Sequence, residues 1–197
     1  MSKMHLGLSE SWICGFDIEK DGIHAQEHMT RTVMHWPRPE NSKDVRGFLG
    51  LTRYYRKFIE HYAHIAMPLY AIGTPPKRKG DVGRRCGKPR RVMRTPFAWD
   101  RECQNAFDNL KKALCNVPVL PLLDPEAKYC LHVNPSQYAL GAVLSQVQDK
   151  ADKVMSHFSN KLHDAETRDP AYDRELLGIP DAIFYWKFNL HGAEQPF

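Results

Sequence analysis

The chain has 197 residues, of which 42% are hydrophobic and 26% are charged, values typical of one globular domain or two small ones. No apolar run is long enough to span a membrane and the N-terminal residues lack the apolar core of a signal peptide, which argues against membrane and secreted proteins. The five cysteines form no pair at zinc-binding spacing. We therefore expect free thiols in an intracellular protein, cytoplasmic or nuclear.

The first recognisable element is a hairpin. Residues 12–24 alternate apolar and polar side chains around Asp21-Gly22, a dipeptide typical of tight turns between antiparallel strands. We expect a small hairpin here and a short helix over about residues 25–34.

Residues 43–69 have helical periodicity. The apolar side chains recur at steps of three, four and seven, which predicts one helix with a single packed face: Val45, Phe48, Leu49, Tyr55, Phe58, Ile59 and Tyr62. Asn41 and Ser42 are candidate N-caps. Gly47 and Gly50 each cost a helix about 1 kcal/mol relative to Ala, so we expect close approach by another backbone or by a partner.

The same helix carries a basic and aromatic surface. Arg46, Arg53, Arg56 and Lys57 lie beside Tyr54 and Tyr55, a mixture that suits contacts with phosphates and with bases or sugars. The alternative interpretation is a solvated basic face on an ordinary core helix. Composition alone favours that alternative.

Residues 73–95 hold the basic surplus of the chain. Nine basic residues stand against Asp81 alone in this Pro-, Gly- and Arg-rich stretch, whereas the net charge of the whole chain is +5. We expect a disordered insertion that either binds phosphates through residues such as Arg84, Arg85, Arg90 and Arg91 or is a solvated loop without a function.

The second half of the chain changes from helix to sheet and back. Asp100 is placed to cap a helix with apolar residues at helical spacing, and Pro118 ends that helix. Residues 129–133, 139–146 and 153–159 predict three antiparallel strands. A final helix is indicated by apolar residues at helical spacing: Tyr172, Leu176, Ile179, Ile183 and Trp186.

The segment WPRPENSKDVRGFLGLTRYYRKFIEHYAHIAMPL at 36–69 closely resembles gypsy-type long-terminal-repeat retrotransposon polyproteins, and the resemblance resumes at 97–120, 129–146 and 158–192. It implies an α+β fold: a helical thumb-like segment, then a truncated ribonuclease H (RNase H)-like antiparallel meander with a helix. The parts expected are the end of a reverse-transcriptase palm with the thumb (1–72), the insertion (73–95), a connection segment whose helix packs on a sheet (96–127) and an incomplete RNase H-like domain (128–197).

The family's activities are RNA-directed DNA synthesis and cleavage of RNA in RNA–DNA hybrids. The sequence has no paired-aspartate motif for polymerisation. The family's nuclease uses Mg²⁺ held by carboxylates, and its first aspartate position is occupied here by Asn134. Glu175 matches the second carboxylate and is the remaining candidate metal ligand. Magnesium binding is therefore expected to be weak or absent.

Two further departures affect the last helix. Pro180 and Gly178 stand where the family has an aliphatic residue and an alanine, so we expect the helix to kink or begin late. We also expect one face of the meander to lack a cover and to leave an apolar patch. Three hypotheses follow: a part of a reverse transcriptase and RNase H enzyme, a non-catalytic module that binds RNA–DNA hybrid or other nucleic acid, and a decayed reading frame.

Overall fold

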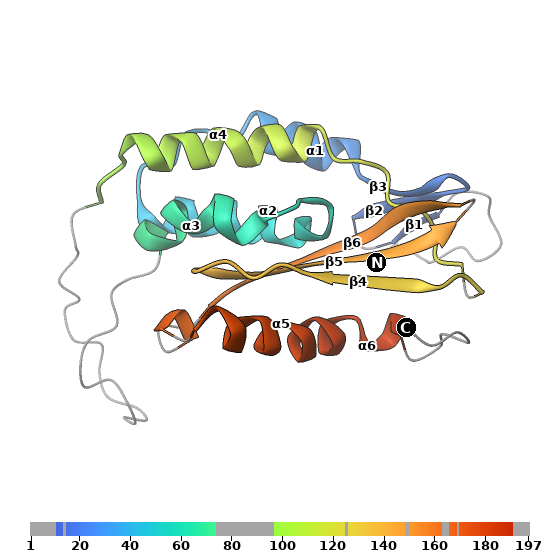
Figure 1. Ribbon diagram of the computed structural model, residues 1–197. Helices are drawn as coiled ribbons and strands as arrows, with labels where there is room; N and C mark the ends of the chain where they lie inside the picture. The colour runs from blue at the N-terminus through green and yellow to red at the C-terminus, as the bar shows by residue number, and fades with distance from the viewer. Residues whose placement is uncertain are drawn as a thin grey trace, which may run out of the picture.

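The computed structural model describes residues 11–13, 15–73, 97–124, 126–148, 150–162, 166–168 and 170–190. Its helices and strands form four layers (Figure 1). Helices α1 (Glu27–Met34) and α4 (Arg101–Cys115) lie on α2 (Ser42–Tyr54) and α3 (Tyr62–Gly73), which lie above a sheet. Helix α5 (Ala171–Tyr185) lies on the opposite face of that sheet, so the predicted α+β class is confirmed.

The N-terminal hairpin is present as predicted. Strands β2 (Phe16–Glu19) and β3 (Gly22–Ala25) pair antiparallel, and β1 (Ser11–Ile13) adds a third strand. Gly22 has φ +149°, and a Cβ there would lie 2.4 Å from the carbonyl oxygen of Leu120. Only glycine permits this approach, which lets Ile23 and Leu120 exchange backbone hydrogen bonds of 2.7 and 3.1 Å.

The predicted helix over 43–69 is wrong in one respect, because the structure divides it. Helix α2 ends at Tyr54, a 3-10 turn η1 (Arg56–Phe58) follows, and α3 begins at Tyr62. The backbone is extended at Ile59 and enters the left-handed region at His61, with φ 53°. This break lets α3 pack against α2, and the hydroxyl oxygens of Thr52 and Tyr62 lie 2.9 Å apart between them.

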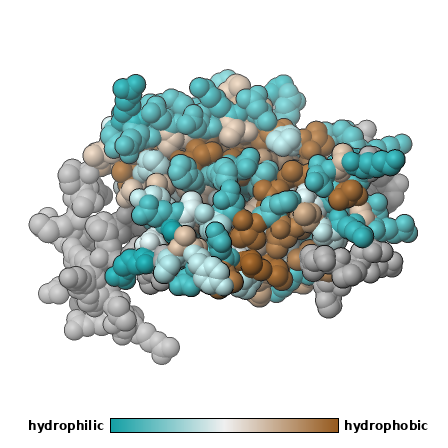
Figure 2. All heavy atoms as spheres, in the orientation of Figure 1, coloured by the Kyte–Doolittle hydropathy of each residue, from teal (hydrophilic) through white to brown (hydrophobic). Residues whose placement is uncertain are grey.

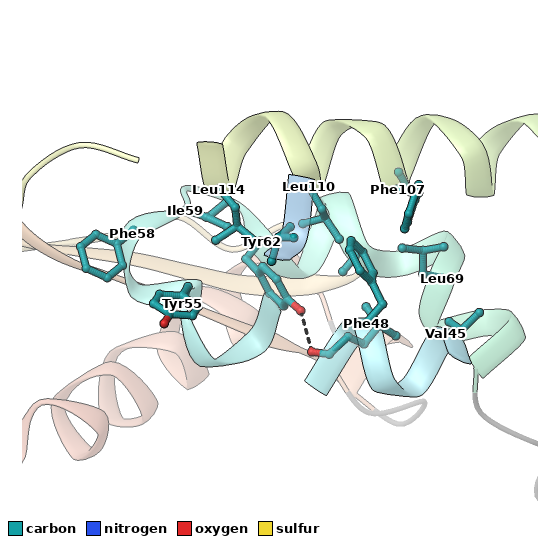
Figure 3. Packing of buried hydrophobic residues seen from close by; sticks show 14 of the residues in the cluster. Val45, Phe48, Tyr55, Phe58, Ile59, Tyr62, Leu69, Phe107, Leu110 and Leu114 are labelled. Atoms are coloured by element: carbon teal, nitrogen blue, oxygen red, sulfur yellow. Dashed lines mark hydrogen bonds between the residues drawn. The ribbon is translucent and has the colours of Figure 1, made fainter. Parts of the chain in front are cut away.

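The packed face of these helices is nevertheless the predicted one. All seven apolar residues of the stripe are buried, and the ring of Phe48 lies 4.6 Å from that of Phe107 on α4 (Figure 3). The cap of α2 is confirmed, since Asn41 Oδ1 accepts hydrogen bonds from the backbone N–H groups of Lys43 and Asp44 at 2.9 and 3.0 Å.

Helix α4 begins as predicted and packs mainly on other helices. The side chain of Asp100 accepts a 2.7 Å hydrogen bond from the backbone N–H of Cys103, which confirms the N-cap. The buried face of α4 packs chiefly on α1 and α3. Apolar residues of α1, α2, α3 and α4 form one core, against which Phe16, Ile23 and Ala25 of the N-terminal sheet also pack.

The second sheet has the predicted meander. Strand β5 (Ala139–Gln148) pairs antiparallel with β4 (Tyr129–Val133) and with β6 (Ala151–Lys161). The short helices η2 (Glu166–Arg168) and α6 (Lys187–Leu190) precede and follow α5. Helix α5 begins at Ala171 and continues past Pro180, so the expected late start is wrong.

Glycine at 178 has a local reason. A Cβ on Gly178 would lie 2.7 Å from Val133 Cγ1 and 3.6 Å from Leu140 Cδ2. The absent side chain therefore brings α5 close to strands β4 and β5.

Both faces of the meander are covered, which corrects the expectation of an open face. Phe158 packs against Tyr185 and Trp186 below the sheet, while the next residue, Ser159, accepts a 2.9 Å hydrogen bond from the backbone N–H of Ala63 above it. The expected apolar patch lies instead on the outer side of α5, at Tyr172, Leu176, Ile179, Ile183 and Phe184. Figure 2 shows apolar side chains gathered over this lower part of the molecule, in contrast to the hydrophilic outer face of α4. Within the described ranges, no helix combines the length and apolarity that crossing a membrane requires.

Candidate nucleic-acid interface and nuclease site

The first candidate surface is a row of residues on the exposed side of α2. Arg46, Gly50 and Arg53 follow one another at steps of four and three, so they lie on one stripe of the helix, and all three are exposed. A Cβ on Gly50 would have no atom within 4 Å, and one on Gly47 would meet only the ring of Trp36, at 3.7 Å. Among the described residues, no other backbone approaches either glycine, so the structure gives no reason within this part of the chain for glycine at position 50.

The structure separates Tyr54 and Lys57 from this row. The ring of Tyr54 stacks on Phe16 with centroids 5.1 Å apart, and Lys57 Nζ lies 3.7 Å from the centroid of the same ring. Partial burial of Lys57 lowers the pKa of its ammonium group. Both residues thus pack on the N-terminal hairpin, with about half of the Tyr54 side chain still exposed.

Arg56 belongs to a third environment. Its guanidinium lies 5.2 Å from the ring centroid of Tyr185, at the end of α5. This cation–π contact joins η1 to α5. The insertion arginines Arg84, Arg85, Arg90 and Arg91 lie outside the described residues.

The second candidate site surrounds the end of β4. Asn134 follows β4 directly, is exposed, and donates its backbone N–H to the carbonyl of Gly141 at 2.7 Å. Ser136 closes the next turn, because its backbone N–H and its hydroxyl both bond to the carbonyl of Ala139, at 2.8 and 3.1 Å. A pocket of about 300 Å³ opens beside this turn, and its lining includes Asn134, Ser136, His61 and His64.

Glu175 lies on α5, the helix that contacts β4 and β5. Its neighbour Arg174 donates a 3.3 Å hydrogen bond from its guanidinium to the carbonyl of Ser136, and Gly178 lies against Val133, the last residue of β4. Glu175 itself is exposed. Contacts from Arg174 and Gly178 therefore hold the segment of α5 that carries Glu175 against the segment that carries Asn134.

The residues around the end of β4 do not fit a pair of magnesium ions. Two hard cations need several anionic oxygens, whereas Asn134 offers a neutral amide and the pocket beside it is lined by no carboxylate in the described part of the chain. The charge of Arg174 further disfavours a cation there. The one group of three close ligand side chains among the described residues is elsewhere, at Glu19, Asp21 and His24 on the hairpin turn.

Sequence reasoning missed a buried histidine between the helices and the sheet. His157 on β6 is 9% exposed, and its Nδ1 has no hydrogen-bond partner among the described residues. Burial lowers the pKa of His157, while Glu60 raises it and His61 lowers it. The neutral ring is thus the form that this interface accommodates. Side chains alternate between the two faces of a strand, and Phe158 faces α5. This alternation could have predicted that His157 lies on the opposite face, toward α3.

The comparisons with solved structures concern foamy viral protease–reverse transcriptase. The chain matches that enzyme solved in complex with RNA/DNA hybrid with a TM-score of 0.71 and 18% identity, over 95% of this chain and 23% of that one. The match to the structure in complex with dsDNA has a TM-score of 0.70, also at 18% identity, over 96% and 36% of the two chains. At this identity the likeness concerns the fold.

Curated relatives are polyproteins of transposons. The chain is 28% identical to the retrovirus-related Pol polyprotein from transposon opus and 35% identical to that from transposon 297, both of Drosophila melanogaster, and each match covers 98% of this chain. It is 29% identical over its whole length to the transposon Tf2-3 polyprotein of Schizosaccharomyces pombe. The chain spans only 18%, 16% and 13% of these relatives' lengths.

The family comparison is the most specific. The pattern of the family described as "RNase H-like domain found in reverse transcriptase" matches residues 99–197, which is just over half of the chain. The matched part includes α4, the β4–β6 meander and α5. The chain therefore belongs to the family of RNase H-like domains found in reverse transcriptases.

Proposed function

We propose that this chain is the thumb, connection and RNase H-like portion of a gypsy-type retrotransposon Pol polyprotein, and that it holds nucleic acid without cutting it. Helix α2 is the gripping element, and an RNA–DNA hybrid is the ligand that the family's activity favours. The alternative of an active RNase H part is disfavoured by the donor set around Asn134.

The observation that carries this proposal is the row on α2. A glycine on the exposed side of a helix costs about 1 kcal/mol relative to alanine. At Gly50 no neighbouring atom within the described part of the chain requires that cost. Arg46 and Arg53 lie one turn on either side, and neither takes part in the ion pairs found among the described residues. A bare backbone patch between two guanidinium groups suits a sugar–phosphate backbone lying across the helix.

The comparisons support the same ligand class. The printed titles of the similar folds name complexes of foamy viral protease–reverse transcriptase with RNA/DNA hybrid and with dsDNA. The relatives are Pol polyproteins of transposons.

The grip is tested by replacing Gly50 with alanine. Gly50→Ala is expected to raise the free energy of unfolding by about 1 kcal/mol, because alanine favours the helix and nothing obstructs its Cβ. The same substitution is expected to weaken binding of a labelled RNA–DNA hybrid, because the methyl group keeps the ligand's backbone away from the helix. Urea unfolding and fluorescence anisotropy measure the two effects.

Gly47→Ala is the matched control. Its Cβ would meet the Trp36 ring at an ordinary distance of 3.7 Å, and it lies off the row of Arg46 and Arg53. We expect a similar stabilisation and unchanged hybrid affinity. If Gly50→Ala stabilises the chain and leaves hybrid affinity unchanged, the row is an ordinary solvated helix face.

A further inference from the structure

A groove lies between the end of α2, the edge strand β6 and the end of α5. It has a volume of about 440 Å³, and its lining includes Arg53, Arg56, Asn160, Phe184 and Lys187. A smaller hollow of about 110 Å³ continues along β6 and shares Arg53, Arg56 and Asn160 with the groove, adding Lys161. The two hollows form a channel on the opposite end of α5 from Glu175.

The channel is positively charged. Arg53, Arg56, Lys161 and Lys187 supply four cationic groups, against the single carboxylate of Asp181. None of these groups belongs to the ion pairs found in the described ranges. Their positive charge is therefore available to an anionic ligand that follows the channel.

The channel also presents an aromatic surface and an amide. The Phe184 side chain is 71% exposed, and Lys187 Nζ lies 4.5 Å from its ring centroid. Asn160 adds hydrogen-bond donors and acceptors on the sheet side. An exposed ring beside cations is the combination that binds unpaired bases, since the ring stacks on a base while the cations contact phosphates.

We propose that this channel binds a single strand of nucleic acid. A duplex keeps its base faces inside its own stack, so it could use the cations and would leave Phe184 without a partner. An acidic peptide could also use the cations, and it too lacks a planar base for the ring. The channel shares Arg53 with the α2 row, and it is otherwise built from residues that the row does not use.

The test compares single-strand and hybrid affinity in one set of variants. Phe184→Ala is expected to weaken binding of a fluorescent oligothymidylate of about ten nucleotides by about tenfold, because stacking on the ring is lost. Its affinity for the RNA–DNA hybrid is expected to change less than about twofold. Phe188→Ala is the control, since Phe188 is 84% exposed and also close to Lys187, yet does not line the channel.

The outcomes distinguish the channel from the hybrid grip of α2. The channel rests on the proposed function only in that both bind nucleic acid. Unchanged oligothymidylate affinity in Phe184→Ala, or an equal loss for both ligands, would overturn the single-strand channel. The channel would also be overturned if poly-glutamate displaced the labelled oligonucleotide as efficiently as unlabelled oligonucleotide does. If the chain binds oligothymidylate through Phe184 and does not bind the hybrid, the channel is supported and the hybrid grip is refuted.

Discussion

A labelled RNA–DNA hybrid incubated with this chain and Mg²⁺ is expected to remain uncut, and Asn134→Asp alone is expected to leave it uncut. Cleavage by two metal ions requires carboxylates that bridge and neutralise both ions. The substitution would add one negative charge at the end of β4, and the guanidinium of Arg174 would still lie 3.3 Å from the carbonyl of Ser136. A denaturing gel read after prolonged incubation measures the cut RNA.

Magnesium titration provides the accompanying measurement. Asn134→Asp is expected to bind Mg²⁺ more tightly than the unmodified chain, because a carboxylate replaces a neutral amide at the end of β4. Asn134→Ser is the matched control that adds no charge. Cut RNA in the unmodified chain or in Asn134→Asp would contradict the interpretation of the end of β4 as an impaired metal site.

The second large effect is expected in the helical core. Phe48 is fully buried and packs between Trp36 and Phe107, with ring centroids 6.0 and 4.6 Å away. Phe48→Ala is expected to lower the free energy of unfolding by about 3–5 kcal/mol, through lost burial and the cavity left behind. Because small domains are stable by only about 5–15 kcal/mol, this substitution removes much of the total.

Tyr172→Ala is the control for the core prediction. Tyr172 lies on α5 with 68% of its side chain exposed, so its truncation is expected to change stability by no more than about 0.5 kcal/mol. Urea unfolding of both variants measures the two changes in the free energy of unfolding. Similar losses in the two would mean that the core is not centred on the α2, α3 and α4 stripes.

Local features of the fold could be predicted because they depend on neighbours in the sequence. The caps at Asn41 and Asp100 depend on a side chain and the N–H groups two or three residues later. The meander was predicted from the alternation of apolar and polar side chains within residues 129–159, which is also a local property of the sequence. The break between α2 and α3 was missed because η1 keeps a nearly helical spacing, so the apolar stripe continues through it.

The site residues were predictable only in part. A periodic pattern indicated that Arg46, Arg53, Tyr54 and Lys57 share one helical segment, but it could not show that Phe16 of the hairpin draws Tyr54 and Lys57 to another side. The channel between η1 and α5 joins residues more than a hundred positions apart, and no spacing in the sequence reveals it.

The central claim, that α2 grips nucleic acid, is tested most directly by the salt dependence of hybrid binding. We would compare the unmodified chain with Arg46→Gln/Arg53→Gln, using Arg101→Gln on α4 as the control. Neutralising two phosphate contacts is expected to weaken binding and to reduce the slope of log affinity against log salt by about 2, with no change in the control. An unchanged slope in the double variant would contradict the account.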